Sequence, residues 1–458
     1  MSLTTLTATR IHLGQLSNSS GEETFLSFEK FPYTGLSKTY CVDRQVADSA
    51  CSATAYLCGI KANEATIGVN AAVKLHDCEG MNNASNRVNS IAHQSQLAGK
   101  RSGIVTTTRV THASPAGAYA HIASRDWEAD TDVINDEKNP EKCIDIAQQL
   151  IHGETGKNFN VIFGGGRSYF LPKELSETIG YRSDGRNLID EWKKQKKDNN
   201  VTSYEYVEDL PQLKKINGDT EYVLGLFNSD HLSFNLDRDV NNEPSLQEMT
   251  EKAIEVLSQG DKGFFLFVEG GKIDHAHHAT QAAIALDETI EFHKAIETAV
   301  NLTNEEDTLI VVTSDHSHTM TLNGYPVRGN DILGIGGRAE DKRNYTTLTY
   351  ANGPSADNTA TVNITEELLG DKDFGYPSLF LLGSETHGGD DVGIFARGPW
   401  AHLFSGVTEQ HVIPHILSYA SCVGGNETAC SNSKNVVNTF SLTILSLTCI
   451  TMLQNFLL

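Results

Sequence analysis

Residues 264–278 read FFLFVEGGKIDHAHH, and this stretch decides the fold class. Its first five residues form a continuous apolar run, as expected for a strand buried on both faces of a parallel sheet. Glu269 ends the run, two glycines follow, and Asp274 and His278 stand four residues apart. Residues at i and i+4 share one face of a helix, so both side chains can bind one metal ion. The stretch therefore predicts a buried strand that leads into a metal-binding helix.

Comparable apolar runs occur elsewhere in the chain and also lead to polar residues. They are residues 104–107, 161–163, 309–313 and 392–396. Amphipathic stretches that favour helices lie among them, most clearly at 247–257 and 279–300. Alternating strands and helices predict an α/β fold with a doubly wound, mostly parallel central sheet flanked by helices. Ligands of such folds bind at the C-terminal ends of the strands.

The segment from Asn323 to Glu385 interrupts this alternation. It is rich in Gly, Asn, Asp and Thr and has little helical period, which indicates an inserted subdomain. We expect the α/β core to span residues 1–322 and 386–430, with the insertion at 323–385 and a processing signal at 431–458.

Composition excludes some classes of protein. The 458 residues are 39% hydrophobic and 21% charged, which is typical of an ordered globular protein. A formal net charge of -23 argues against a nucleic-acid partner, because phosphate backbones are bound by basic faces. The 8 cysteines and several Asn-x-Ser/Thr sequons favour a secreted or surface glycoprotein. The sequons begin at Asn18, Asn83, Asn200, Asn301, Asn344, Asn363 and Asn426.

Both ends of the chain suggest processing. Residues 440–458 read FSLTILSLTCITMLQNFLL, and small residues at 431–433 and a short polar spacer precede them. This order predicts a glycosylphosphatidylinositol attachment signal, hence a protein anchored to the outer face of the plasma membrane. A single transmembrane helix is the alternative, although no basic residues follow the run. Residues 1–4 lack the charged and apolar regions of a signal peptide, so we expect the N-terminus to be incomplete.

Two more motifs offer metal ligands. The motif TSDHSH at 313–318 places Asp315 and His316 in a tight turn after an apolar run, where both can reach a metal ion. A polar loop with a satisfied histidine is the alternative. The motif ETHGGDD at 385–391 contains His387, which can complete a zinc site with Asp274 and His278. Three protein ligands leave one position open for catalysis.

Two stretches suit a phosphate group. In ADSACSATAYLCG, residues 47–59, Ser49 stands at the start of a helix, and helix N-termini favour anions. Asp-Ser is also an ordinary helix cap, which is the structural alternative. In THASPAGAYAHIASR, residues 111–125, Ser114 is an oxygen ligand for a hard cation. Arg125 carries a planar fork that matches two phosphate oxygens.

Together these stretches, with IFGGGR at 162–167 and ETHGGDDVGIFARGP at 385–399, resemble the animal-type alkaline phosphatases. The resemblance extends from Met1 to about residue 430. It implies two zinc ions and one magnesium ion per subunit. The implied ligands are Asp274, His278 and His387 for the first zinc, Asp315, His316 and Ser49 for the second, and Ser114 and Glu269 for magnesium. Arg125 is implied to bind phosphate, and His112 and His318 to lie close around the metals.

The resemblance also implies an activity and an assembly. The activity is hydrolysis of phosphate monoesters at alkaline pH, with broad leaving-group tolerance, through a covalent phosphoserine at Ser49. The assembly is a homodimer in which Tyr325 of the inserted crown reaches the partner's active site. A catalytically inactive surface-binding homologue is the alternative. A sulfatase relative is disfavoured because Ser49 lacks the C/S-x-P-x-R context.

The sequence departs from the family pattern at its start. The family opens with a strand that ends in Asp-Gly-Met-Gly, whose Asp bridges the second zinc and magnesium. This chain aligns from that Met onward, so we expect the strand and the Asp to precede Met1 and the chain as written to be inactive. The calcium site of animal members is only partly matched. Phe227 and Glu243 occupy two of its positions, and Asn228 stands where an acidic residue is usual.

The resemblance implies the disulfides Cys78–Cys143 and Cys422–Cys430. Cys41 and Cys51 are candidates for an additional pair, Cys58 is expected to stay free, and Cys449 leaves with the C-terminal tail.

Overall fold

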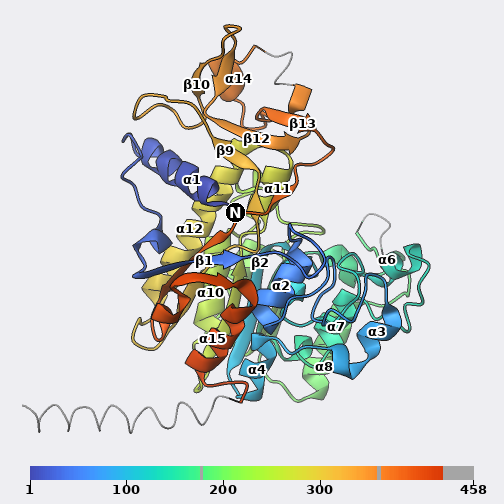
Figure 1. Ribbon diagram of the computed structural model, residues 1–458. Helices are drawn as coiled ribbons and strands as arrows, with labels where there is room; N and C mark the ends of the chain where they lie inside the picture. Colours follow the sequence, from blue (N-terminus) through green and yellow to red (C-terminus); the bar gives the residue numbers. More distant parts are fainter. Residues whose placement is uncertain (176–178, 358–362, 426–458) are drawn as a thin grey trace, which may run out of the picture.

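The fold is built around two β-sheets, shown in Figure 1 with a smaller β-rich part above them. The computed structural model describes residues 1–175, 179–357 and 363–425. One sheet has five strands in the order β4-β5-β3-β2-β6, and all of its pairs are parallel. The other has four strands in the order β16-β1-β15-β7.

The strands of the first sheet, in spatial order, are β4 (Tyr204–Val207), β5 (Tyr222–Leu226), β3 (Val161–Gly165), β2 (Arg101–Arg109) and β6 (Phe264–Glu269). Those of the second are β16 (Gly406–Glu409), β1 (Tyr33–Lys38), β15 (Val392–Arg397) and β7 (Ile310–Val312). Each apolar run singled out in the sequence lies on one of these strands, which confirms the α/β class. Continuous apolar runs form strands here because helices cover both faces of the sheets.

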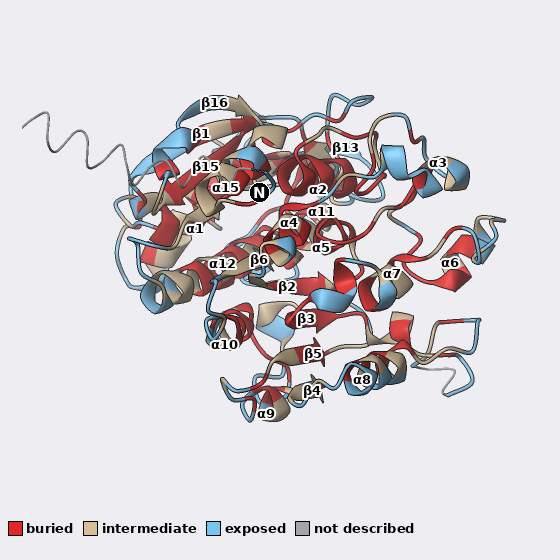
Figure 2. Cartoon of the chain, turned by 90° about the horizontal axis from the view of Figure 1, so that it is seen from below, coloured by how far each residue is buried: buried red, intermediate tan, exposed pale blue. Residues whose placement is uncertain are grey.

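Helices cover the sheets in two layers, as Figure 2 shows. One layer contains α1 (Leu3–Leu16), α10 (Leu246–Leu257) and α12 (Ala282–Leu302). The other contains α2 (Ser49–Cys58), α4 (Ile91–Leu97) and α15 (Ile413–Ser421), with α7 (Ile146–His152) and α8 (Leu188–Asp198) further along the sheet. Shorter helices are α3 (Cys78–Asn82), α5 (Ala113–Ala116), α6 (Asp130–Asn135), α9 (Leu210–Leu213) and α11 (Lys272–His278). Single 3-10 turns occur at Ser27–Lys30, Ala84–Asn86, Gly156–Asn158, Arg167–Phe170, Asn235–Asp237, Ala401–Phe404 and Gln410–Val412.

Three details differ from the sequence-based expectation. β15 runs antiparallel to both of its neighbours, because an apolar run reports burial and not strand direction. β6 and most of β7 are only half-buried, whereas β2 and β3 are buried along nearly their whole length. The helix expected from residue 279 begins at Ala282, because Thr280 has a positive φ of 57° that separates α11 from α12.

The segment after β7 forms small sheets of its own, at the top of Figure 1. A three-stranded sheet has the order β13-β12-β9, and β10 pairs with β11. The bounds are β9 (Met320–Leu322), β10 (Ile335–Arg338), β11 (Asn344–Thr346), β12 (Leu348–Gly353), α14 (Glu366–Leu369) and β13 (Ser378–Leu381). These elements share a cluster of buried apolar side chains with Ala8 of α1 and Leu286 of α12. The proposed boundaries of the inserted subdomain stay a prediction.

None of the helices in the described ranges combines the length and the apolar character needed to span a bilayer. The apolar tail at 440–458 lies outside those ranges.

Candidate active site

The candidate nucleophile stands at the start of a helix, as expected. Helix α2 begins at Ser49, and Asp48 is its N-cap. The Asp48 carboxylate accepts hydrogen bonds from the backbone N–H groups of Ala50 at 3.1 Å and Cys51 at 3.2 Å. A third comes from the N–H of Ala65 at 3.0 Å. Asp48 therefore uses the free amides of the first turn and fixes the direction in which Ser49 projects.

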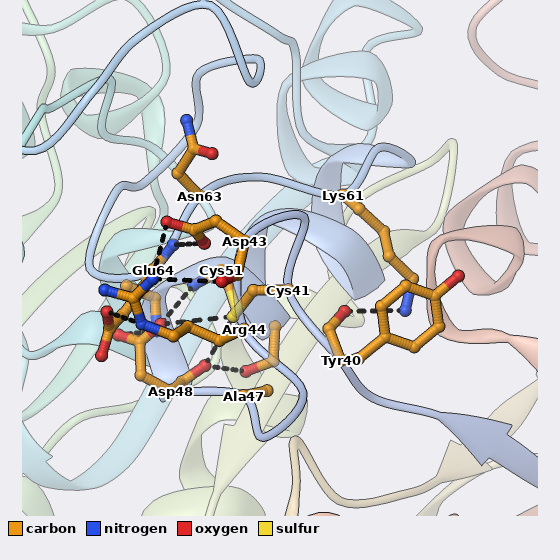
Figure 3. The surroundings of a disulfide bond; sticks show 12 residues. Tyr40, Cys41, Asp43, Arg44, Ala47, Asp48, Cys51, Lys61, Asn63 and Glu64 are labelled. Atoms are coloured by element: carbon orange, nitrogen blue, oxygen red, sulfur yellow. Dashed lines mark hydrogen bonds and ion pairs between the residues drawn. A yellow bond between two sulfur atoms is a disulfide. The ribbon is translucent and has the colours of Figure 1, made fainter.

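A disulfide secures the same turn. Cys41 is bonded to Cys51, which confirms the additional pair, and Figure 3 shows this bond beside Asp48. Arg44 on the connecting loop pairs with Glu64 at 2.7 Å between Nε and Oε2. The loop that precedes Ser49 is thus tied to the helix behind it and to a second segment of the chain.

Asp274 and His278 face each other on α11, as the i, i+4 spacing predicts. Asp274 Oδ2 lies 3.3 Å from His278 Nε2, and Asp274 Oδ1 lies 3.3 Å from His387 Nε2. His278 Nε2 and His387 Nε2 are 3.2 Å apart. The motif at 385–391 therefore lies beside the helix that carries Asp274 and His278. β14 (His387–Gly388) pairs with β8 (Ser317–His318), and this pairing holds His387 close to α11.

The remote nitrogens of these imidazoles are held by backbone carbonyls. His278 Nδ1 lies 2.5 Å from the carbonyl oxygen of Glu385, and His387 Nδ1 lies 2.8 Å from that of Ala47. An Nδ1–H that donates to a carbonyl leaves Nε2 as the free lone pair, which is the tautomer of a metal-ligating histidine. Both Nε2 atoms thus point at the same place.

A buried carboxylate oxygen, Asp274 Oδ1, lies close to these nitrogens. Asp274 Oδ1 is buried and makes no hydrogen bond of good geometry among the described residues, although imidazole nitrogens surround it. Asp274, His316, His318 and His387 each offer a ligand atom, and these atoms lie within 4.8 Å of one another. One carboxylate among several imidazoles is a donor set that suits zinc. The residues therefore fit a metal ion.

The second motif lies next to Ser49. His316 Nε2 is 3.0 Å from Asp315 Oδ2 and 3.2 Å from Ser49 Oγ, and it is 4.0 Å from Asp274 Oδ1. Burial lowers the pKa of His316 to about 4, so its ring is neutral in neutral solution. His316 holds the pKa of Asp315 below its usual value against the effect of burial. A neutral imidazole and an ionised carboxylate are the forms that bind a cation.

One of the two expected magnesium ligands, Glu269, has hydroxyl groups around it. Glu269 ends β6, and its Oε2 accepts hydrogen bonds from Thr106 at 2.6 Å and Thr108 at 3.2 Å. Burial raises the pKa of Glu269 to about 7, although Thr106, Ser114 and Thr108 stabilise its ionised form. A buried carboxylate lined by hydroxyl oxygens is an all-oxygen environment, which is what a hard cation prefers.

Arg125 lies beside the start of α2. Its Nη1 is 3.1 Å from Asp48 Oδ2, and its Nη2 is 3.3 Å from His112 Nε2. The carboxylate that caps α2 therefore also orients the guanidinium beside Ser49. His112, expected close to the metals, lies here beside Arg125.

The structure adds residues that the sequence did not single out. His231 and His275 form a group of imidazoles with His112, with ring centroids 4.4 Å apart for His231 and His275. Glu385 is almost fully buried and its Oε2 lies 2.7 Å from His318 Nδ1. Burial opposes the charged form of His318, but the neighbouring carboxylates of Asp274 and Glu385 raise its pKa. His275 and Glu385 stand inside motifs quoted above, whereas no pattern marks His231.

Other expected residues lie apart from the site. Tyr325 is fully exposed. Glu243 accepts hydrogen bonds from Asn228 Nδ2 and the N–H of Ser233, both at 2.9 Å. Within residues 1–175, 179–357 and 363–425, no group of three or more acidic, His or Cys ligands includes Glu243, so calcium at Phe227 and Glu243 stays a prediction.

The remaining cysteines agree with expectation where they are described. Cys78 is bonded to Cys143, and Cys58 is buried and free. The expected Cys422–Cys430 pair involves Cys430, which lies outside the described residues, as does Cys449.

Comparisons with known proteins agree with this geometry. The family model for alkaline phosphatase matches residues 1–423. A membrane-bound alkaline phosphatase of Bombyx mori is 47% identical over 97% of this chain and 82% of its own length. The human tissue-nonspecific isozyme is 43% identical over 94% of this chain and 83% of its own length.

Solved structures show the same fold. The alkaline phosphatase of a psychrophilic Shewanella is 25% identical, has a TM-score of 0.63, and is matched over 91% of this chain and 96% of its own. That of Thermus thermophilus is 19% identical, has a TM-score of 0.65, and is matched over 92% and 89% of the two chains.

A serine at a helix start, an arginine beside it and clustered carboxylates and imidazoles that could hold metal ions are features that suit phosphoryl transfer. The chain belongs to the alkaline phosphatase family, whose members are phosphoric monoester hydrolases.

Proposed function

We propose that Ser49 is the nucleophile, that it becomes a covalent phosphoserine during turnover, and that two zinc ions and one magnesium ion assist it. The 3.2 Å distance between Ser49 Oγ and His316 Nε2, beside the Asp274 group, carries this proposal. The alternative of an inactive binding homologue gains no support, because the relatives found are named as alkaline phosphatases.

We infer the metal ligands from the resemblance to the family, and the grouped donor atoms around Asp274 support the presence of a metal site. Asp274, His278 and His387 would hold the first zinc, and Asp315 and His316, with Ser49, the second. Ser114 and Glu269 would hold magnesium. When bound, these ions supply Lewis acidity that lowers the pKa of coordinated hydroxyl groups and stabilises oxygens that gain negative charge.

The side chains then define the steps. Ser49 Oγ loses its proton to solvent and attacks phosphorus, so that a new P–O bond forms while the bond to the leaving oxygen breaks. The departing alkoxide takes up a proton from solvent and leaves as the alcohol. Arg125 binds two of the non-bridging oxygens and holds the phosphoryl group in line with Ser49. A water molecule next attacks the phosphoserine, which releases inorganic phosphate and regenerates the Ser49 hydroxyl. These contacts recognise only the phosphoryl group, so the leaving alcohol is free to vary.

Hydrolysis of p-nitrophenyl phosphate by the complete protein tests the proposal. Chelation should abolish the activity, and zinc with magnesium should restore it. Ser49→Ala should reduce kcat by several orders of magnitude, because the covalent step is lost. Ser52→Ala is a matched control on the same helix, since its hydroxyl donates to the Asp48 carbonyl at 2.9 Å and lies away from the substrate. Equal loss in both variants would indicate damage to α2 instead of loss of the nucleophile.

We also propose a homodimer on the cell surface. Large apolar side chains are exposed in the segment 322–382, including Tyr325, Val327 and Phe380. Exposed apolar groups of this kind mark interfaces. The C-terminal signal would attach the dimer to the membrane through a lipid, in line with the membrane-bound relative from Bombyx mori.

A further inference from the structure

A short loop closed by a disulfide contains the candidate nucleophile. Cys41 is bonded to Cys51 at a sequence separation of 10, so the bond closes a ring of backbone that includes Ser49. Residues 42–46 of this ring are exposed, whereas both cysteines are only 2% exposed. The ring therefore has an outer part in solvent and a buried base, and Figure 3 shows the surroundings of that base.

Three functional side chains are placed by consecutive residues of the buried base. The carbonyl oxygen of Ala47 lies 2.8 Å from His387 Nδ1. The carboxylate oxygen Oδ2 of Asp48 lies 3.1 Å from Arg125 Nη1. Ser49 follows directly as the first residue of α2. A movement of this short segment would therefore displace the nucleophile, the phosphate-binding arginine and one imidazole of the metal group together.

The amino-terminal end of the ring is held by a second segment of the chain. The N–H of Val42 donates to the carbonyl oxygen of Ala62 at 2.9 Å. Asp43 Oδ1 accepts a hydrogen bond from the N–H of Glu64, also at 2.9 Å. The disulfide then joins this anchored end covalently to the first turn of α2.

We propose that the Cys41–Cys51 disulfide is a positioning element for catalysis. It keeps the ring short, so that residues 47–49 hold the nucleophile, the arginine and the imidazole at fixed distances from one another. A misplacement of about 1 Å can cost a hundredfold in rate, so small movements of the ring have large effects. The inference rests on the proposed function, because it takes Ser49 as the nucleophile and Arg125 as the group that binds phosphate.

The Cys78–Cys143 disulfide provides a matched control. It closes a much longer loop, with a sequence separation of 65. Helix α3, which begins at Cys78, lies towards the edge of the molecule in both views, whereas α2 lies nearer its centre (Figures 1 and 2). A longer closed loop stabilises the fold more in the chain-entropy account. Removal of the control bond should therefore lower Tm more, and removal of the Cys41–Cys51 bond should impair the site more.

The test compares two double variants of the full chain, each loaded with zinc and magnesium and assayed well below its Tm. In Cys41→Ser with Cys51→Ser, kcat for p-nitrophenyl phosphate should fall roughly tenfold or more, because Ser49 is no longer held in line with phosphorus. The inhibition constant for inorganic phosphate should rise several-fold, because Asp48 no longer fixes Arg125. In Cys78→Ser with Cys143→Ser, both parameters should stay close to those of the wild type.

Two results of this comparison would overturn the proposal. One is an unchanged kcat and phosphate affinity in the Cys41–Cys51 variant. The other is an equal loss in the two double variants, or a failure of the Cys41–Cys51 variant alone to fold, because the bond would then serve the fold and not the site.

An insertion tests the length of the ring without removal of a cysteine. Gly-Ser placed between Arg44 and Gln45 lengthens the exposed part of the ring, and exposed loops tolerate insertions. We expect kcat and phosphate affinity to fall as in the Cys41–Cys51 variant, by a smaller factor, while Tm stays almost unchanged. Full activity of the insertion variant would contradict the need for a short ring.

Failure of the proposed function would look different. If the wild type neither hydrolyses p-nitrophenyl phosphate nor forms a phosphoserine at Ser49, the nucleophile is wrongly assigned. Phosphate binding measured by calorimetry then still reports whether the ring positions Arg125. If the wild type turns over and the Cys41–Cys51 variant matches it in kcat and phosphate affinity, only the positioning role fails.

Discussion

At the residue scale, the site depends on side chains that hold one another in place. Asp48 caps α2 and pairs with Arg125, so one carboxylate sets both the nucleophile and the phosphate-binding arginine. Glu385 does the same for two imidazoles, through its carbonyl for His278 and its carboxylate for His318. These shared contacts hold the ligand side chains in position before any metal ion or substrate binds.

Arg125 provides the first prediction. Arg125→Ala should raise KM for phosphate monoesters and the inhibition constant for inorganic phosphate by roughly ten- to a hundredfold, because a charge-assisted contact contributes about 1.5–3 kcal/mol. Arg125→Lys keeps the charge but lacks the planar fork. Its KM and inhibition constant should therefore lie between those of the wild type and those of Arg125→Ala. Zinc content should stay near that of the wild type. Unchanged phosphate affinity in Arg125→Ala would remove Arg125 from substrate binding.

The motifs were predictable at this scale because their residues stand beside apolar runs. Asp274, His278, Asp315 and His316 follow strands, and the structure brings them together. His231 was not predictable, because the loop that carries it shows no spacing that indicates a ligand. The additional pair of Cys41 and Cys51 remained open in the sequence because spacing alone does not fix a pairing.

At the element scale, α12 carries a buried acid. Glu288 is 3% exposed and accepts a hydrogen bond from the N–H of Asn235 at 2.6 Å. Burial raises its pKa to about 8, against the hydrogen bond from Asn235 and the charge of Lys272, while Asp287 and Glu291 add to the rise. A helix that must pack against the sheet thus carries a carboxyl group that resists ionisation.

Glu288 therefore predicts a pH dependence of stability. The folded pKa is about 8 and the ordinary value is 4.5, so its contribution is complete below about pH 4.5 and is lost as the pH rises through about 8. Glu288→Gln should make the protein more stable than the wild type at pH ~9 by a few kcal/mol, since each pKa unit corresponds to about 1.4 kcal/mol. Near pH ~4, Glu288→Gln should bring no gain in stability over the wild type.

Chemical denaturation at the two pH values measures this effect. Glu297→Gln is the matched control, because Glu297 is exposed on the same helix and should show no such difference. The same stability change at both pH values in Glu288→Gln would rule out a titration effect.

Strand positions were predictable at this scale, and strand directions were not. The run at 392–396 forms β15 as expected, but β15 is antiparallel because chain connection, not hydrophobicity, sets its direction. Likewise, the run at 264–268 predicts burial on both faces. β6 reaches only half-burial because it borders a cavity of about 940 Å³ that β7 also lines.

At the scale of the whole molecule, the N-terminus lies at the centre of the structure, between the sheets and the β-rich part above them (Figure 1). The Met1 nitrogen donates to Ser314 Oγ at 2.7 Å and to the carbonyl oxygen of His316 at 2.9 Å, so Met1 lies beside the segment that carries Asp315 and His316.

Lipid anchoring is the prediction at this scale. Phosphatidylinositol-specific phospholipase C should release the active protein from intact cells into the medium, because the mature protein would carry a lipid and not the apolar tail. Mass spectrometry of the released protein should find no peptide from residues 440–458. Protein that stays on treated cells with that peptide present would instead indicate a transmembrane segment.

The central claim is the covalent intermediate at Ser49, and trapping it is the most direct test. The zinc- and magnesium-loaded protein is mixed with radiolabelled phosphate and quenched in acid. The label is then located by peptide mass spectrometry. We predict a single phosphoserine at Ser49, and no label after Ser49→Ala. Label on any other residue, or turnover by the Ser49→Ala protein at the wild-type rate, would contradict the account.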